Sequence, residues 1–189
     1  MSFDLPKPVL VRKPNTLQQV ANILYQEPIV AVDTEANSLY AYQEQVCLIQ
    51  FSTRDKDYLV DPLAINDLSP LASLFASHKT EKIFHAAEYD LIVLDRDFGF
   101  EFNNLFDTML AARILGWKKV GLASILQSHF GIKPNKRYQR ANWGKRPLPD
   151  EMLTYAQLDT HFLIPLREKL YQELMEVDRW DLAEEDFQR

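Results

Sequence analysis

Two acidic residues lie two positions apart at the end of an apolar segment, where carboxylates are unusual. Asp33 and Glu35 come just after the apolar residues 29–32. If that segment is a β-strand, its period of two places both carboxylates on the same face of a sheet. Like charges held close together are costly unless a cation neutralises them, and hard carboxylate oxygens suit Mg²⁺ or Mn²⁺. The pair therefore indicates either a metal site or a strand that ends in a polar, solvated turn.

Three further residues could complete such a site. Asp90 lies near the expected N-terminus of a helix, a position where Asp also stabilises the helix dipole. Tyr155 and Asp159 are four positions apart, so a helix brings the phenol and the carboxylate onto one face about a turn apart. Each pattern alone is common. Four acids and a phenol in the order strand, helix, helix form a far more specific pattern.

The elements that must carry these residues follow from hydrophobic spacing and from Gly and Pro positions. Short apolar segments predict strands at residues 29–32, 46–51, 58–60 and 82–84. Helical spacing predicts helices at residues 15–27, 63–76, 86–98, 107–115 and 121–130, a loop at 132–148, and a long helical stretch from residue 149 with a kink at Pro165. Strands come first and helices later. This order predicts an α/β fold with a mixed β-sheet flanked by α-helices and a helical C-terminal half.

Composition limits the class of protein. With 189 residues, 47% hydrophobic and 25% charged, the chain resembles ordinary globular proteins and is expected to form one domain. Its single cysteine, Cys47, excludes an intramolecular disulfide, is expected in the core, and favours a reducing compartment. No secretory signal and no stretch of 18 uncharged apolar residues is present, so we expect a cytoplasmic protein without a membrane partner.

Charge is distributed unevenly along the chain. The net charge is −6, yet residues 118–146 contain eight cations and no carboxylate. Cations interleaved with aromatic rings are typical of single-stranded nucleic-acid binding, although a solvated basic loop has the same composition. The candidate nucleic-acid contacts in this segment are Lys136, Arg137, Tyr138, Arg140, Trp143, Lys145 and Arg146.

Taken together, these motifs resemble the three exonuclease motifs of the DEDD superfamily in its tyrosine variant, above all ribonuclease D and the related nuclear exosome exonuclease. The resemblance lies in Asp-Thr-Glu at 33–35, in His85 with Asp90 five positions later, and in Tyr155 to Asp159. Supporting stretches lie at residues 37–40, 46–50, 106–108 and 136–149. The resemblance covers roughly residues 20–175, and several separated motifs agree in order and spacing.

The resemblance implies a ribonuclease H-like sheet and a 3′-5′ exonuclease that releases nucleoside 5′-monophosphates with two divalent metal ions, Mg²⁺ or Mn²⁺. By position, Asp33, Glu35 and Asp159 would hold one ion, and Asp33 the other, with Asp90 acting partly through water. Two ions about 4 Å apart acidify the attacking water and neutralise the leaving oxygen. Tyr155, with an ordinary pKa near 10, is expected to orient that water rather than to deprotonate it.

Smaller features refine this interpretation. Leu39 matches the place of an apolar wedge against the terminal bases in related exonucleases, although packing after a strand would explain it equally well. Thr154 stands where the histidine variant of the superfamily has its histidine, and Ala86 stands where polymerase proofreading domains have an asparagine. We expect Asp107 to cap a helix or to support the site. We expect no catalytic histidine, although His85 could help to orient the site.

The leading hypothesis is a metal-dependent 3′-5′ exoribonuclease that acts on single-stranded RNA 3′ ends, formed by one domain of residues 1–189. An exonuclease on single-stranded DNA remains an alternative, since recognition of the 2′-hydroxyl cannot be predicted from these residues. A non-catalytic RNA-binding module is another. Longer ribonuclease D proteins continue into helical nucleic-acid-binding domains, so we expect weaker binding from this chain unless a partner contributes. The oligomeric state stays open.

Overall fold

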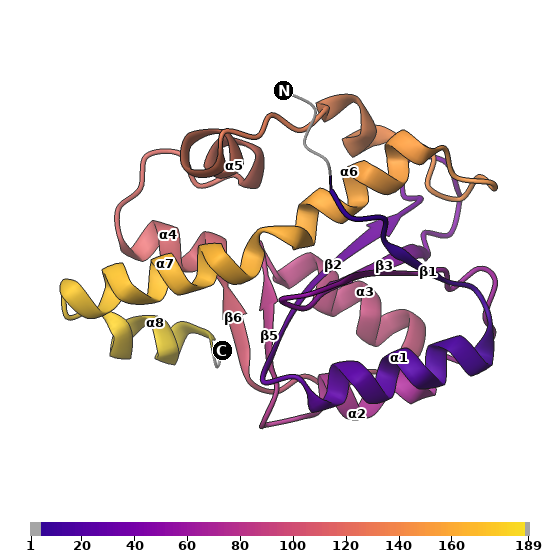
Figure 1. Cartoon of the computed structure of the whole chain (residues 1–189), viewed down its shortest axis with the longest axis horizontal. Helices are drawn as coiled ribbons and strands as arrows, with labels where there is room; N and C mark the ends of the chain where they lie inside the picture. Colours follow the sequence, from indigo (N-terminus) through magenta and orange to yellow (C-terminus); the bar gives the residue numbers. More distant parts are fainter. Residues whose placement is uncertain (1–4, 188–189) are drawn as a thin grey trace.

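A six-stranded mixed sheet with helices on both faces forms the centre of the computed structural model, which describes residues 5–187 (Figure 1). The strands are β1 (Val9–Val11), β2 (Ile29–Ala36), β3 (Val46–Ser52), β4 (Asp57–Val60), β5 (Glu81–Phe84) and β6 (Leu105–Asp107), in the spatial order β1-β4-β3-β2-β5-β6. The helices are α1 (Pro14–Gln26), α2 (Ala72–Phe75), α3 (Glu88–Phe98), α4 (Thr108–Ile114), α5 (Leu122–Phe130), α6 (Asp150–His161), α7 (Leu163–Glu176) and α8 (Trp180–Phe187). Short 3-10 helices, η1 (Ser69–Leu71) and η2 (Lys136–Arg140), interrupt two loops. The mixed sheet and the helical C-terminal half confirm the predicted fold class.

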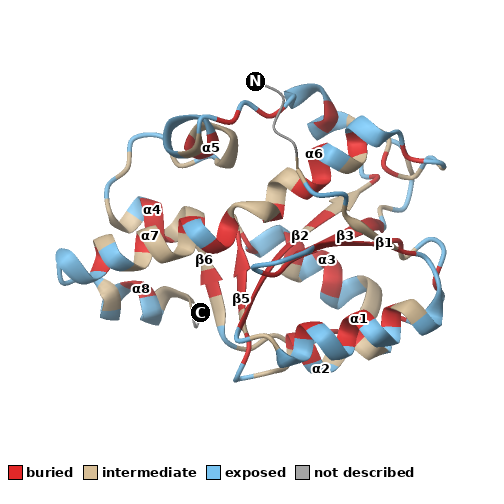
Figure 2. Cartoon of the chain, in the orientation of Figure 1, coloured by how far each residue is buried: buried red, intermediate tan, exposed pale blue. Residues whose placement is uncertain are grey.

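Strand β2 is central, and its alternating side chains pack into the core on both faces of the sheet. It pairs antiparallel with β3 and parallel with β5. Val30 and Val32 belong to the buried cluster shared with α1, α2 and α3. Ile29 and Ala31 belong to the buried cluster shared with α4 and α7 on the opposite face. Figure 2 shows the resulting buried strands between partly exposed helices. Because side chains alternate along a strand, Asp33 continues the second face, toward α6 and α7.

The four predicted strands are all present, and each observed strand includes the predicted residues. The three-residue strands β1 and β6 were not predicted, because segments this short have no clear periodicity. The helix expected at residues 63–76 forms only in its second half, as η1 and the four-residue α2. Asp61 and Asp67 accept hydrogen bonds from the backbone N–H groups two positions later, and such turns compete with helix formation.

The C-terminal helical stretch breaks where α6 meets α7. The kink was predicted at Pro165, and the helix in fact ends at His161, four positions earlier. Proline has no N–H to donate to the carbonyl of the residue four positions before it, so the break falls at that carbonyl. Residues 132–148 form the expected loop apart from η2. Within the described residues, no helix is both long and apolar enough to cross a membrane.

Candidate active site

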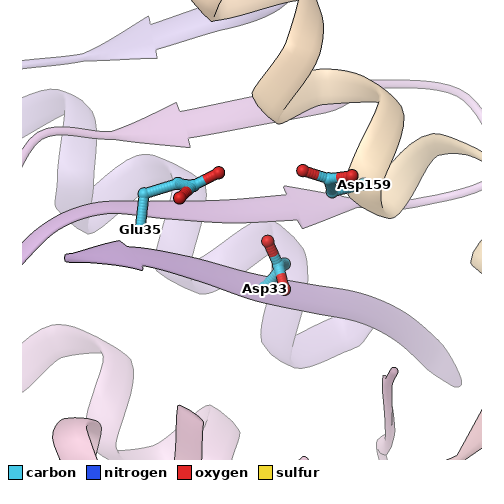
Figure 3. A group of neighbouring side chains, drawn as sticks. All are labelled: Asp33, Glu35 and Asp159. Carbon is cyan, nitrogen blue, oxygen red and sulfur yellow. The ribbon is translucent and has the colours of Figure 1, made fainter. Parts of the chain in front are cut away.

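Three carboxylates converge at the end of β2. Asp33 and Glu35 project from β2, and Asp159 approaches from α6 (Figure 3). One carboxylate oxygen of each lies within 4.8 Å of one oxygen of each of the others. A register shift between Glu35 and Ala36 ends the regular pairing of β2 with β3 directly after these residues. The strand period and the helical spacing therefore bring together groups that are more than 120 positions apart in sequence.

Asp90 reaches the same strand end from the other face of the sheet. It lies in the first turn of α3, and its Oδ1 accepts a hydrogen bond of 2.5 Å from the hydroxyl of Thr34, the residue between the two β2 acids. Because Asp90 comes from the other face, its carboxylate does not belong to the close group formed by Asp33, Glu35 and Asp159. Its charge nevertheless raises the pKa of Asp33, Glu35 and Asp159.

Asp107 holds the turn that leads into α3. Its carboxylate accepts hydrogen bonds from the N–H groups of Ala86 and Ala87, at 3.0 and 2.9 Å. It also caps α4 by accepting from Met109 and Leu110. Ala86 has a φ of 62°, a left-handed conformation that is unfavourable for alanine. The predicted capping role of Asp107 is confirmed, and the same carboxylate stabilises the strained turn that positions Asp90.

The pKa values of all four acids are raised, mainly by burial. Burial raises the pKa of Asp33 well above its usual range, and the charges of Asp90, Asp159 and Glu35 raise it further. Burial, followed by Asp159 and Asp90, has the same effect on Glu35. Burial and then Asp90 raise the pKa of Asp159 to about 8. Burial raises the pKa of Asp90 to about 7, against the opposing hydrogen bonds from Thr34. The site thus concentrates negative charge that the protein does not neutralise.

Tyr155 lies beside these acids in the wall of a cavity of about 470 Å³. Its ring is 7% exposed and packs against Tyr138 and Trp143, with ring centroids 5.8 and 6.2 Å away. Burial, and then the charges of Asp159, Glu35 and Asp33, raise the pKa of the Tyr155 hydroxyl above its ordinary value. The phenol therefore stays protonated at neutral pH and can donate a hydrogen bond.

The donor set fits divalent metal ions. Asp33, Glu35 and Asp159 offer only hard oxygen ligands, and none of them forms an ion pair with a described residue. The Nε2 of Gln50 is 3.4 Å from Asp33 Oδ2, while its buried Oε1 has no described hydrogen-bond partner. An unneutralised group of partly buried carboxylates is stable only when positive charge or protons are supplied to it.

The predicted nucleic-acid contacts divide into two groups. Leu39 is 64% exposed, and Lys136, Arg137, Arg140 and Lys145 are also exposed. Lys136 lines the cavity that contains Tyr155 and the acids. These side chains are available to a ligand.

Three other predictions need correction. Trp143 is 1% exposed and Tyr138 is 8% exposed, so both rings pack in the core around Tyr155 and are not free to stack on bases. Arg146 donates to both oxygens of Asp61, at 2.8 and 2.7 Å, and to the backbone carbonyl of Cys47. Its guanidinium therefore anchors the basic loop to the sheet instead of remaining available to phosphate. Cys47 itself is a buried core residue, as predicted.

Several residues around the cavity were not predicted. Gln139 hydrogen-bonds the Tyr155 hydroxyl and lines the cavity. Gly121 and the first three residues of α5, Leu122 to Ser124, form another wall. Outside the cavity lining, Tyr42 is fully exposed in the loop after β2. The alternation of cations and aromatic rings indicated the basic loop as a binding segment, but no sequence pattern indicated these positions.

Comparisons with known proteins agree with this geometry. A model of the 3′-5′ exonuclease family matches residues 8–175. The chain belongs to this family. The exosome complex exonuclease RRP6 of Saccharomyces cerevisiae is 37% identical over 179 residues, which cover 94% of this chain and 24% of that protein. The chain thus spans about a quarter of the length of this relative.

Solved structures of the family have the same fold. The catalytic core of RRP6 from Trypanosoma brucei matches with a TM-score of 0.93 and 35% identity, over 99% of this chain and 52% of that one. The structure of Escherichia coli RNase D, described as an exoribonuclease involved in structured RNA processing, matches with a TM-score of 0.89 and 28% identity. That match covers 96% of this chain and 48% of RNase D.

Proposed function

We propose that this domain is a metal-dependent 3′-5′ exoribonuclease that removes nucleoside 5′-monophosphates from single-stranded RNA ends. The observation that carries the proposal is the convergence of Asp33, Glu35 and Asp159 without a cation, at a cavity that also contains Tyr155. Hydrolysis of a phosphodiester requires stabilisation of developing negative charge, which these acids alone oppose. The arrangement therefore suits a site at which a bound cation supplies positive charge to the cavity.

We assign four residues to metal binding. Asp33, Glu35 and Asp159 would hold one divalent ion, and Asp33, supported by Asp90, a second, with Mg²⁺ or Mn²⁺ as the ions. When bound, two such ions lower the pKa of a water molecule and stabilise the charge on the attacking and leaving oxygens. Thr34 keeps the Asp90 carboxylate oriented toward this strand end through its 2.5 Å hydrogen bond.

Tyr155 would orient the attacking water. Its hydroxyl keeps its proton because burial and the neighbouring acids raise its pKa, so it is a hydrogen-bond donor and not a base. Tyr138 and Trp143 pack against the ring, and Gln139 contacts the hydroxyl. These three neighbours restrict the positions that the phenol can adopt.

The exposed cations of the basic loop would guide the substrate. Lys136 lines the cavity, and Arg137, Arg140 and Lys145 are exposed in the same loop. The loop after β2 is joined to it by a 2.6 Å hydrogen bond from the Tyr40 hydroxyl to the Arg140 carbonyl. Leu39 and Tyr42, exposed in that loop, offer apolar and aromatic surface to bases, while the cations contact phosphates.

RNA is favoured over DNA as the substrate because the relatives named above include an exosome complex exonuclease and an exoribonuclease. We further propose that residues 1–189 act as one exonuclease domain. The buried, unpaired Cys47 is consistent with a reducing compartment such as the cytoplasm.

Cleavage assays with labelled oligonucleotides test this function. A single-stranded RNA labelled at its 5′ or 3′ end, and DNA of the same sequence, would be incubated with Mg²⁺, Mn²⁺ or EDTA. We expect a ladder of shortened 5′-labelled RNA, early release of the 3′-terminal mononucleotide, and no cleavage in EDTA. Binding without metal-dependent cleavage would instead identify a non-catalytic RNA-binding module, and equal cleavage of DNA would remove the preference for RNA.

A further inference from the structure

Helix α6 has a second polar face that does not contribute to the cavity. Tyr155 and Asp159 line the cavity on one side of the helix. Gln157, Thr160 and His161 lie on the side that contacts β3 and β4. The proposed function gives these three residues no role, although Gln157 and Thr160 are buried.

A buried carboxylate on β4 accepts hydrogen bonds from residues on this second face. Asp57 is 3% exposed, and its Oδ2 accepts hydrogen bonds from Gln157 Nε2 at 2.6 Å and from His161 Nδ1 at 2.8 Å. Its Oδ1 accepts from the Ser52 hydroxyl at 2.6 Å, and Ser52 lies 2.7 Å from the Thr160 hydroxyl. We call these five residues the Asp57 network. Burial raises the pKa of Asp57, but the hydrogen bonds from His161, Ser52 and Gln157 outweigh burial and lower it.

The Asp57 network contacts the C-terminal end of α6, where the backbone hydrogen bonds of the helix stop. Helix α6 ends at His161, two positions after Asp159, because Pro165 cannot continue the backbone hydrogen bonds. Gln157 and His161 are one turn apart and flank Asp159 on either side. Two contacts to one fixed carboxylate determine both the rotation of the helix end and its position along its axis.

We propose that Asp57 is a positioning residue: through Gln157 and His161 it sets where the Asp159 carboxylate stands relative to the two acids of β2. The inference rests on the proposed nuclease function, since it matters only if those three carboxylates share an ion. A displacement of about 1 Å at such a site costs about 10²-fold in rate. Groups that orient metal ligands typically contribute about 10- to 100-fold in affinity or activity.

Two substitutions of His161 provide the sharpest test. Asn and Leu are similar in size, but only Asn places an N–H donor near the position of the imidazole Nδ1. His161 is partly exposed, so neither change should prevent folding. We expect His161→Asn to retain most of the wild-type behaviour and His161→Leu to lose it. Asp57→Asn removes the charge of the shared acceptor and is expected to show a loss similar to that of His161→Leu.

A control must separate positioning from general loss of stability. Glu81, on β5 and three strands away from β4, accepts two hydrogen bonds from Arg167 of α7, at 2.7 and 2.8 Å. Glu81→Gln breaks a carboxylate contact between sheet and helix without touching α6. All variants would be compared by urea denaturation and assayed at a temperature at which each is fully folded.

Two measurements decide the proposal. Isothermal titration with Mn²⁺ in the absence of RNA should give about tenfold weaker binding for His161→Leu and Asp57→Asn, and unchanged binding for Glu81→Gln. With RNA, kcat should fall about tenfold in the same two variants, whereas KM stays constant because the basic loop is intact. Wild-type Mn²⁺ affinity and kcat in His161→Leu would overturn the proposal, as would an equal loss in Glu81→Gln. If the wild-type chain binds Mn²⁺ but cleaves nothing, the proposed function fails, and the Mn²⁺ affinities alone decide the role of Asp57.

Discussion

Two groups of buried or partly buried acids in this chain have opposite pKa shifts. Asp57 and Asp61 are buried on and next to β4, and each accepts several hydrogen bonds, in the case of Asp61 from the guanidinium of Arg146. Burial raises their pKa values, but these partners outweigh it and lower both. At the end of β2, the partly buried Asp33 and Asp159 form no ion pair with a described residue. The 3.4 Å hydrogen bond from Gln50 to Asp33 does not offset burial and repulsion, and the pKa values of both acids rise.

This contrast indicates that the uncompensated charge at the site is a functional feature. A fold that provides hydrogen-bond donors for the buried Asp57 and Asp61 and for the partly buried Asp107 can satisfy carboxylates that are shielded from solvent. The missing positive charge at the site is what a divalent cation supplies. The same Asp→Asn change should therefore have opposite consequences in the two regions.

Asp33→Asn should have the largest effect on activity. Metal ions contribute several kcal/mol of transition-state stabilisation, so loss of this ligand should lower kcat by about 10³-fold or more. The metal-free protein should become more stable at neutral pH, because one of several repelling charges is removed. Turnover assays and urea denaturation measure the two effects. Retained turnover would remove Asp33 from the site.

Tyr155→Phe should have the next largest effect. Without the hydroxyl the attacking water loses an orienting donor, and kcat should fall by about 10²-fold. Mn²⁺ affinity should not change, since the phenol is not assigned as a ligand. An unchanged kcat would show that the hydroxyl does not act on the water.

Asp61→Asn probes the compensated region. Removing the charge leaves the mostly buried Arg146 without its partner, so the free energy of unfolding should fall by about 2 to 4 kcal/mol. Mn²⁺ binding should be retained, in contrast to Asp33→Asn. If both substitutions shift stability in the same direction, the distinction between the acids with hydrogen-bond donors and the acids at the end of β2 is wrong.

Lys136→Ala should have the smallest effect. Loss of one phosphate contact should raise KM by a few fold for every RNA sequence and reduce the slope of log KM against log salt by about one. Lys79→Ala, which removes another exposed lysine outside the cavity, serves as the control. Equal effects of the two changes would mean that Lys136 contributes only to the overall charge.

The success of prediction from sequence also differed between the two regions. Local periodicity was sufficient to place Asp33 with Glu35 and Tyr155 with Asp159, because these relations depend on a single strand or helix. The basic loop could not be interpreted in the same way. Composition does not determine which aromatic ring is buried, and Trp143 packs beside Tyr155 instead of facing solvent.

Contacts between distant positions account for the remaining differences. Arg146 pairs with Asp61, 85 positions away, and Gln157 with Asp57, 100 positions away. No pattern within either segment indicates these partners. The opposite approach of Asp90, from the helix behind the sheet, likewise depends on how α3 packs and on the turn that Asp107 stabilises.

The pH dependence of metal-free stability tests the central claim most directly. Because the pKa values of Asp90 and Asp159 rise to about 7 and 8 on folding, the folded state holds protons that the unfolded state has already released. The melting temperature in EDTA should therefore fall as the pH increases from about 7.5 to 8.5, where histidines of ordinary pKa are already mostly deprotonated. Mg²⁺ or Mn²⁺ should reverse this decline, and Asp33→Asn should weaken both effects. A melting temperature that rises with pH in EDTA, or that does not respond to either ion, would contradict the account.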